Sequence, residues 1–249
     1  MRFLGIDLGW QSGGSGVCCL QRTTAGLELV TLEHYASRAD VLAWIDRQVA
    51  PDEPALIAVD APTLIPNDKG MRICDRLAHR YFGKYDAGCY PANRDRPFAA
   101  TLIDFGLALE ARGFRHAPTM TPQKVGRYQI ELFPHPATIH LFRLERILKY
   151  KKGRIAARRQ ALDQLRSLQI ATFPTLTPAL PLPAQVLPEV PSGGKALKVV
   201  EDQLDSVTCA YAGAHWWWWG LARNWVLGDG ASGYIVVPAP YDDQICPSE

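Results

Sequence analysis

The sequence predicts a mixed α/β sheet in which three antiparallel strands precede parallel strands, with helices on both faces. Short turns separate the first three strand-like segments, and turns this short join antiparallel strands. The later segment "ALIAVD" is a continuous apolar run after a helical pattern, which is typical of a strand buried on both faces of a parallel sheet. At 249 residues and 47% hydrophobic, the chain can form one substantial core. We expect a single domain over residues 1–249, with insertions near 62–124 and 143–193.

Apolar periodicity and turn residues place the elements of the first half in order. Ser37 is a candidate N-cap for the first helix, which Pro51 stops, and Gly113 ends the last helix of this half. Strands are expected at 2–9, 14–22, 27–34 and 55–60, and helices at 37–50, 70–82 and 98–113.

The second half begins with a buried strand at 126–134 and a helix with Pro136 in its first turn. A basic helical pattern follows at 153–169, and the Pro-rich segment 173–194 is incompatible with a regular element. A long helix is expected at 195–222. The chain then closes with a hairpin turning at Gly228–Gly233.

Composition excludes several classes of protein. A net charge of +2 gives no global field for nucleic acid, so any basic surface must be local. The cysteines show no C-x-x-C spacing, and we expect free thiols in a reducing cytoplasm; they are Cys18, Cys19, Cys74, Cys89, Cys209 and Cys246. The first residues have the pattern of a strand and not of a signal peptide. No apolar run has the length of a membrane span, so we expect a cytoplasmic protein without membrane contact.

Acidic residues stand at the ends of the buried strands. Asp7, Asp60 and Glu131 each end such a strand, and Asp202 and Asp205 share one face of the long helix. The carboxyl ends of parallel strands meet at one edge of a sheet, where ligands bind in open α/β folds. Carboxylates that converge there must be protonated or share cations, and all-oxygen sites suit Mg²⁺ or Mn²⁺. Such ions can activate water and stabilise the leaving oxygen of a phosphodiester.

A structural interpretation of these acids competes with the metal site. A single aspartate after a strand is often a turn former or a helix cap, and "DAP" fits that pattern. For Asp202, a solvated position on the helix surface is the alternative. His135 and His140 lie five apart, on different helical faces, and we do not predict them as metal ligands.

Together the motifs "GIDLGW", "VDAP", "R-x-x-CDR", "IELFPHP" and "EDQLDSVTCAYAGA" resemble the DUF429 family of predicted ribonuclease H-like nucleases, in matching order from about residue 2 to residue 238. The resemblance implies a ribonuclease H-like fold with an acidic, metal-dependent centre. It implies metal ligands on the first strand, the fourth strand and the final helix, matching Asp7, Asp60 and Asp205. Glu131 would be a further catalytic acid, as a ligand or general base. Ser206 departs from the alanine usual after the second helix aspartate, and it is also small.

Two sets of basic residues are candidates for substrate phosphates. Lys151, Lys152 and Arg158 belong to the basic stretch around "KYKKG", for which a solvated helix face is the alternative. Arg72 and Arg76 follow the "VDAP" strand one helical turn apart, with a surface ion-pair network as the alternative. The run Trp216–Trp219 favours either a homodimer contact or packing against the terminal hairpin.

The sequence supports three functional hypotheses. The first is a metal-dependent phosphodiesterase or nuclease acting on DNA or RNA, with Asp7, Asp60, Glu131 and Asp205 as catalytic acids. The second is a nucleotide- or sugar-phosphate-handling enzyme of the actin/sugar-kinase type, which shares the G-x-D-x-G start but carries two such units. The third is a non-catalytic module that binds nucleic acid through the basic insertion.

Overall fold

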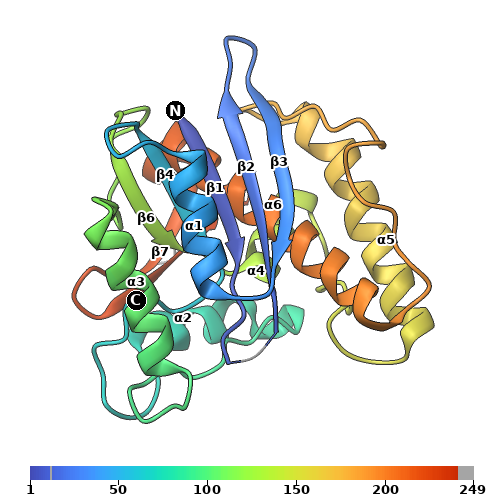
Figure 1. Cartoon of the computed structure of the whole chain (residues 1–249). Helices are drawn as coiled ribbons and strands as arrows, with labels where there is room; N and C mark the ends of the chain where they lie inside the picture. The colour runs from blue at the N-terminus through green and yellow to red at the C-terminus, as the bar shows by residue number, and fades with distance from the viewer. Residues whose placement is uncertain (12, 241–249) are drawn as a thin grey trace.

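The computed structural model describes residues 1–11 and 13–240, and its centre is a six-stranded sheet (Figure 1). The strand order is β3-β2-β1-β4-β6-β5, with β1–β2 and β2–β3 antiparallel and all later pairs parallel. The strands are β1 (Arg2–Asp7), β2 (Ser15–Arg22), β3 (Leu27–Tyr35), β4 (Ala55–Val59), β5 (Arg115–His116) and β6 (Arg127–Glu131). This order confirms the mixed sheet expected from the sequence, in which three antiparallel strands precede parallel strands.

Helices cover both faces of this sheet, and one further helix packs against the C-terminal hairpin. They are α1 (Arg38–Gln48), α2 (Ile73–Phe82), α3 (Ala99–Ala111), α4 (Pro134–Phe142), α5 (Ile155–Thr172) and α6 (Gly194–Trp219). One core joins α1 and α3 to the strand residues Leu4 and Ile6. The other joins α4, α5 and α6 to the opposite face, where Phe3 points. In Figure 1, α1 lies in front of the sheet and α6 crosses behind it.

A smaller third layer closes one edge of the molecule. The antiparallel hairpin of β7 (Asn224–Asp229) and β8 (Gly233–Pro238) packs against α2 and part of α4. Leu132, just after β6, bridges to Val236 of β8 and so connects the hairpin to the main sheet. The sequence predicted this hairpin with the correct turn.

The long helix α6 lies unusually close to the first two strands. A Cβ added at Gly5 would stand 2.0 Å from the carbonyl oxygen of Ser206, and one at Gly16 would stand 2.0 Å from that of Asp202. Only glycine leaves room for this approach, because any side chain would collide with helix backbone. The helix backbone therefore rests directly on β1 and β2, near the end of β1.

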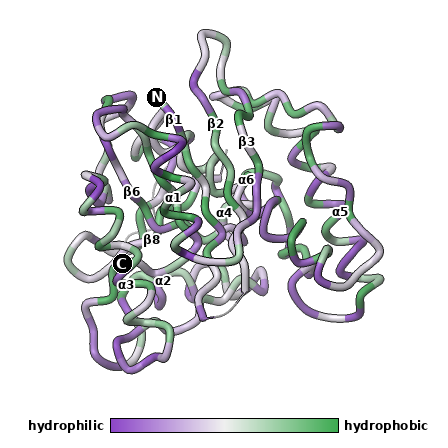
Figure 2. The backbone as a smooth tube through the Cα atoms, viewed as in Figure 1, coloured by the Kyte–Doolittle hydropathy of each residue, from purple (hydrophilic) through white to green (hydrophobic). Residues whose placement is uncertain are grey.

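Several details add to the predicted elements. The two-residue strand β5 was not predicted, since a pairing this short has no periodic signal. Helix α3, within the expected insertion at 62–124, contributes Leu102, Phe105 and Leu109 to the core beneath α1. Helix α5 alternates between hydrophobic and hydrophilic segments (Figure 2), as expected of a helix with one buried face. The Pro-rich segment contains only a short 3-10 turn, at Phe173–Thr175.

The tryptophan run is divided between core and surface. Trp216 and Trp217 are fully buried, and their indole N–H groups donate to the carbonyls of Ala117 and Lys124. Trp218 and Trp219 are half-buried. Burial in the core accounts for the first two rings, whose indole groups bind the segment before β6. Packing against the terminal hairpin and a homodimer through the other two rings stay predictions.

Two sequence-based expectations concern cysteines and membranes. Cys18, Cys19, Cys74, Cys89 and Cys209 are free thiols, as predicted, and Cys246 lies outside the described residues. Within residues 1–11 and 13–240, no helix combines the length and apolar character needed to cross a membrane.

Candidate metal centre

Three carboxylates meet where the central parallel strands end. Asp7 is the last residue of β1, and Asp60 directly follows its parallel neighbour β4. The close packing of α6 on β1 brings Asp205 to the same point. One carboxylate oxygen from each of these residues lies within 4.8 Å of the others. The edge predicted from the strand pattern is therefore where Asp7, Asp60 and Asp205 converge.

Burial makes this group electrostatically unfavourable without a cation. Asp205 is fully buried and Asp7 is 7% exposed. Burial raises the pKa of Asp7 to about 8, although the charge of Lys151 lowers it. Burial also raises the pKa of Asp60 well above its usual range, against the same lysine. Carboxyl groups held this close cannot all be ionised unless positive charge is shared among them.

Lys151 supplies positive charge to the acids. Its ammonium nitrogen lies 2.8 Å from Oδ2 of Asp205 and 3.7 Å from Oδ2 of Asp60. The preceding Tyr150 donates its hydroxyl to Oδ1 of Asp205 at 2.7 Å. Burial opposes the charge on Lys151, but the surrounding carboxylates outweigh it and hold the pKa of the lysine well above its ordinary value.

Arg158 supports the segment that carries this lysine. Its guanidinium donates to the carbonyl of Tyr150 at 2.8 Å and pairs with Glu201 of α6 at 3.1 Å. The side chain predicted to bind substrate therefore ties the start of α5 to α6 and holds the backbone beside Lys151.

Asp202 lies one turn before Asp205 and is buried, so the alternative of a solvated position is wrong. It pairs with Lys198 at 2.6 Å, and its Oδ2 lies 3.1 Å from Nε2 of His34 on β3. Burial raises the pKa of Asp202 to about 6, although Lys198 lowers it. The residue borders the acidic group but has its own cationic partner.

Glu131 belongs to a separate buried network centred on Arg72. The guanidinium makes paired hydrogen bonds to Glu131 at 2.6 and 2.7 Å, and it also binds Asp75 and the carbonyl of Leu64. All five N–H donors of the arginine are used in these contacts. The network fastens α2 to the end of β6. It leaves Arg72 no donor for a substrate phosphate, and it places Glu131 outside the group of converging oxygens.

The other predicted cations lie at the surface. Arg76 is exposed on α2 and donates to the carbonyl of Met71. Lys152 is exposed and lines a pocket together with Lys149 and Lys151. Lys151 thus contacts the acids, whereas Lys152 lies in the neighbouring pocket and Arg76 has no described contact with them.

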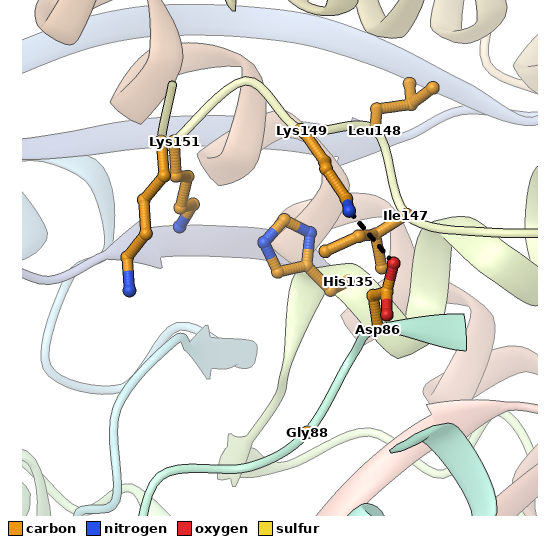
Figure 3. Close-up of a pocket in the computed structure, with 8 residues that line it drawn as sticks. Asp86, Gly88, His135, Ile147, Leu148, Lys149 and Lys151 are labelled. Atoms are coloured by element: carbon orange, nitrogen blue, oxygen red, sulfur yellow. Dashed lines mark ion pairs between the residues drawn. The ribbon is translucent and has the colours of Figure 1, made fainter. Parts of the chain in front are cut away.

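Two adjoining pockets open at the acidic group. The first, about 320 Å³, is lined by Asp7, Asp60 and Asp202 together with Trp10 and Lys198. The second, about 470 Å³, is lined by the three lysines, Asp86 and the apolar side chains Ile147 and Leu148 (Figure 3). Lys151 and His135 line both pockets. In Figure 3, His135 lies between Lys151 and the ion pair of Lys149 with Asp86.

Sequence reasoning missed four residues that surround the acids. Tyr150, Lys198, His34 and His135 come from segments far apart in the chain, and no local pattern connects them to Asp7 or Asp60. Lys198 carried a weak signal, since it lies one helical turn before Asp202. Burial lowers the pKa of His135 to about 4, so its imidazole is neutral near pH 7.

Comparison with known proteins bears on this arrangement. The family model described as "Protein of unknown function (DUF429)" matches residues 5–227. The chain belongs to the DUF429 family. The match covers the end of β1 and all of β4 and α6, so the three converging acids lie within the DUF429 region.

One solved structure is similar in fold to this DUF429 chain. The structure titled "T. thermophilus RuvC in complex with Holliday junction substrate" is similar, with a TM-score of 0.34 and 11% sequence identity over 86% of this chain and 97% of that chain. None of the curated proteins matches.

The donor set of this DUF429 chain fits a divalent metal ion. All three converging ligands are carboxylate oxygens, the donors that Mg²⁺ and Mn²⁺ prefer. Oδ2 of Asp7 is buried without a hydrogen-bond partner. A buried, unpartnered carboxylate oxygen is costly, and a cation bound there would satisfy it. Asp7, Asp60 and Asp205 are therefore the residues that could hold such an ion.

Proposed function

We propose that this protein is a divalent-metal-dependent phosphodiesterase that cleaves nucleic acid, with Asp7, Asp60 and Asp205 holding Mg²⁺ or Mn²⁺. The observation that carries the proposal is the convergence of three carboxylate oxygens within 4.8 Å, beside a pocket that Asp7 and Asp60 line. A bound divalent ion would lower the pKa of a water ligand and stabilise negative charge on a phosphate.

The surroundings of the acids support a phosphate-bearing substrate. Lys149, Lys151 and Lys152 line the adjoining pocket, although the whole chain carries a net charge of only +2. These lysines place positive charge next to the acids, where it would attract the phosphates flanking the cleaved bond. Ile147 and Leu148 give the same pocket an apolar wall that a nucleobase could contact.

The residues around the acids have separate roles in this proposal. The three aspartates bind the ion, while Tyr150 orients Asp205 through its hydrogen bond of 2.7 Å to Oδ1. We assign Arg72 and Glu131 a structural role, because each is the other's buried partner. Arg158 holds the backbone beside Lys151, and Lys152 remains a candidate phosphate contact.

A cleavage assay tests the reaction. Fluorescent single-stranded DNA, duplex DNA and RNA would be incubated with the protein and Mn²⁺, alongside the small diester bis(p-nitrophenyl) phosphate. We expect cleavage of at least one nucleic acid by the wild type and none by Asp7→Asn, because the variant lacks one metal ligand. Cleavage by Asp7→Asn at the wild-type rate would contradict the proposal, and hydrolysis of the small diester alone would contradict the nucleic-acid substrate.

The two alternative hypotheses predict different results. A kinase-type enzyme would be stabilised by ATP in a thermal unfolding experiment, without cleaving phosphodiesters. A non-catalytic module would bind DNA or RNA equally well with and without Mg²⁺, and also after Asp7→Asn. The unpartnered oxygen of Asp7 favours the phosphodiesterase over the non-catalytic module, which needs no metal ion there. The ATP experiment separates the phosphodiesterase from the kinase-type enzyme.

A further inference from the structure

The ammonium group of Lys151 lies where positive charge is needed among the acids. It contacts Oδ2 of Asp205 at 2.8 Å and approaches Oδ2 of Asp60 to 3.7 Å. The other oxygen of Asp205, Oδ1, already accepts the hydroxyl of Tyr150. Oδ2 is therefore the oxygen of Asp205 that a metal ion would need, and Lys151 is the group that contacts it.

Lys151 also forms part of the neighbouring pocket. Its side chain is 31% exposed and lines both the acidic pocket and the pocket of Lys149 and Lys152. Its backbone lies between α4 and α5, beside Tyr150, whose carbonyl is held by Arg158. A lysine side chain is a compact charge on a flexible four-carbon stem. Rotation about that stem can carry the ammonium from one pocket to the other without moving the backbone.

We propose that Lys151 is a tethered cation that occupies the place of a divalent ion among Asp7, Asp60 and Asp205, and that it moves into the adjoining pocket to bind a substrate phosphate when the ion binds. This inference rests on the proposed function and adds a coupling to it. The ion must displace Lys151 from Asp205, so the lysine weakens metal binding in the absence of substrate. The displaced ammonium joins Lys149 and Lys152, so a phosphate group there strengthens metal binding.

This coupling is reciprocal, as any linkage between two binding events must be. A phosphate that holds Lys151 in the second pocket removes the competitor from the acids. A metal ion bound to the acids displaces the ammonium group of Lys151, which then adds positive charge to the phosphate pocket. The protein would therefore assemble its complete site only when metal and substrate are both present.

Calorimetric titration of Mn²⁺ tests the competition. We expect Lys151→Met to bind Mn²⁺ about tenfold more tightly than the wild type, within the usual range of coupling between sites. Arg154→Met removes one exposed positive charge from the same loop and controls for the general effect of charge; we expect its affinity to stay near that of the wild type. An affinity of Lys151→Met equal to or below that of the wild type would overturn the proposal.

A second measurement keeps the test decisive if Lys151→Met does not fold. In wild-type protein with ¹³Cε-labelled lysines, the Lys151 signal is assigned by its loss in Lys151→Arg, which keeps the charge. Titration with Mg²⁺ should move that signal, because the ammonium leaves the carboxylates. An unchanged Lys151 signal at Mg²⁺ saturation would show that the lysine stays among the acids and would overturn the proposal.

Binding of thymidine 5′-monophosphate tests the second position of the lysine. We expect Mg²⁺ to strengthen binding of this nucleotide to the wild type and to have no such effect in Lys151→Met. An equal gain in the variant would overturn the movement into the phosphate pocket.

The proposed function and this inference fail in different ways. If Mn²⁺ does not bind the wild type, or binds equally after Asp7→Asn, the metal centre itself is wrong. If Mn²⁺ binds in an Asp7-dependent manner but Lys151→Met gives no gain, only the tethered cation is wrong.

Discussion

Gly5 of β1 lies against the backbone of Ser206 in α6, so closely that a Cβ at the glycine would stand 2.0 Å from the serine carbonyl oxygen. This contact sets the depth at which α6 packs on the sheet. It also helps to set where Asp205 meets Asp7, since Asp205 directly precedes Ser206 and Asp7 lies two residues after Gly5 on β1. The geometry of the acidic group thus depends on the absence of a side chain at Gly5.

Gly5→Ala should destabilise the protein, because the new methyl group can be accommodated only by moving α6 away from β1. We expect a loss of about 1–3 kcal/mol in the free energy of unfolding, measured by urea denaturation. Gly83→Ala is the matched control: its Cβ would meet only His79, at 3.9 Å, and we expect no destabilisation. Wild-type stability in Gly5→Ala would contradict the packing described here.

Arg72→Met should be strongly destabilising, because it leaves the buried carboxyl groups of Glu131 and Asp75 without their cation. Removing one partner of a buried ion pair typically costs about 3–5 kcal/mol. Chemical denaturation of the variant checks this cost. Arg76→Met, on the exposed side of the same helix, should change stability by less than about 0.5 kcal/mol. If the two variants proved equally stable, Arg72 would not have the structural role assigned to it.

His215 should make the protein sensitive to acid. It is buried on α6 with Nδ1 at 2.8 Å from Oδ1 of Asn224, and burial lowers its pKa from 6.5 to about 4. Between these two pH values the unfolded chain binds a proton that the folded protein does not. Stability is therefore complete above pH 6.5 and falls as the pH drops toward 4, by up to about 3 kcal/mol from this residue.

Urea denaturation at pH 7 and pH 4.5 measures this effect. His215→Gln keeps a polar side chain but cannot take up the proton, so its stability should fall less between the two pH values. His135, whose pKa is also lowered to about 4, leaves part of the acid sensitivity in the variant. An identical loss of stability in wild type and His215→Gln would contradict the prediction.

The sequence was sufficient to predict every strand except β5, the antiparallel and parallel parts of the sheet, and the edge at which Asp7, Asp60 and Asp205 converge. These features follow from local patterns, namely buried apolar runs, short turns and acids at strand ends. The same patterns placed Glu131 at the strand edge. The ion pair of Glu131 with Arg72 could not be predicted from the sequence, because the two residues are 59 positions apart and only the folded chain brings them together.

The contact of Lys151 with Asp205 could not be predicted from the sequence for the same reason. The basic stretch predicted a surface that attracts phosphate, and nothing in its spacing indicated that one lysine turns inward to Asp205. For Asp202, the solvated position that the sequence also allowed is wrong, because the side chain is buried. Its carboxylate has two partners in the fold, His34 on β3 and Lys198 one turn away on α6.

Thermal unfolding in a titration with Mn²⁺ tests the metal centre most directly, using wild type, Asp7→Asn and the exposed control Asp163→Asn. An ion that binds only the folded state at a hundred times its dissociation constant adds about 2.7 kcal/mol of stability. We therefore predict a rise of roughly 5–10 °C in Tm for the wild type and the control. Asp7→Asn should show no rise. An equal rise in Asp7→Asn, or none in the wild type, would contradict a metal site at Asp7, Asp60 and Asp205.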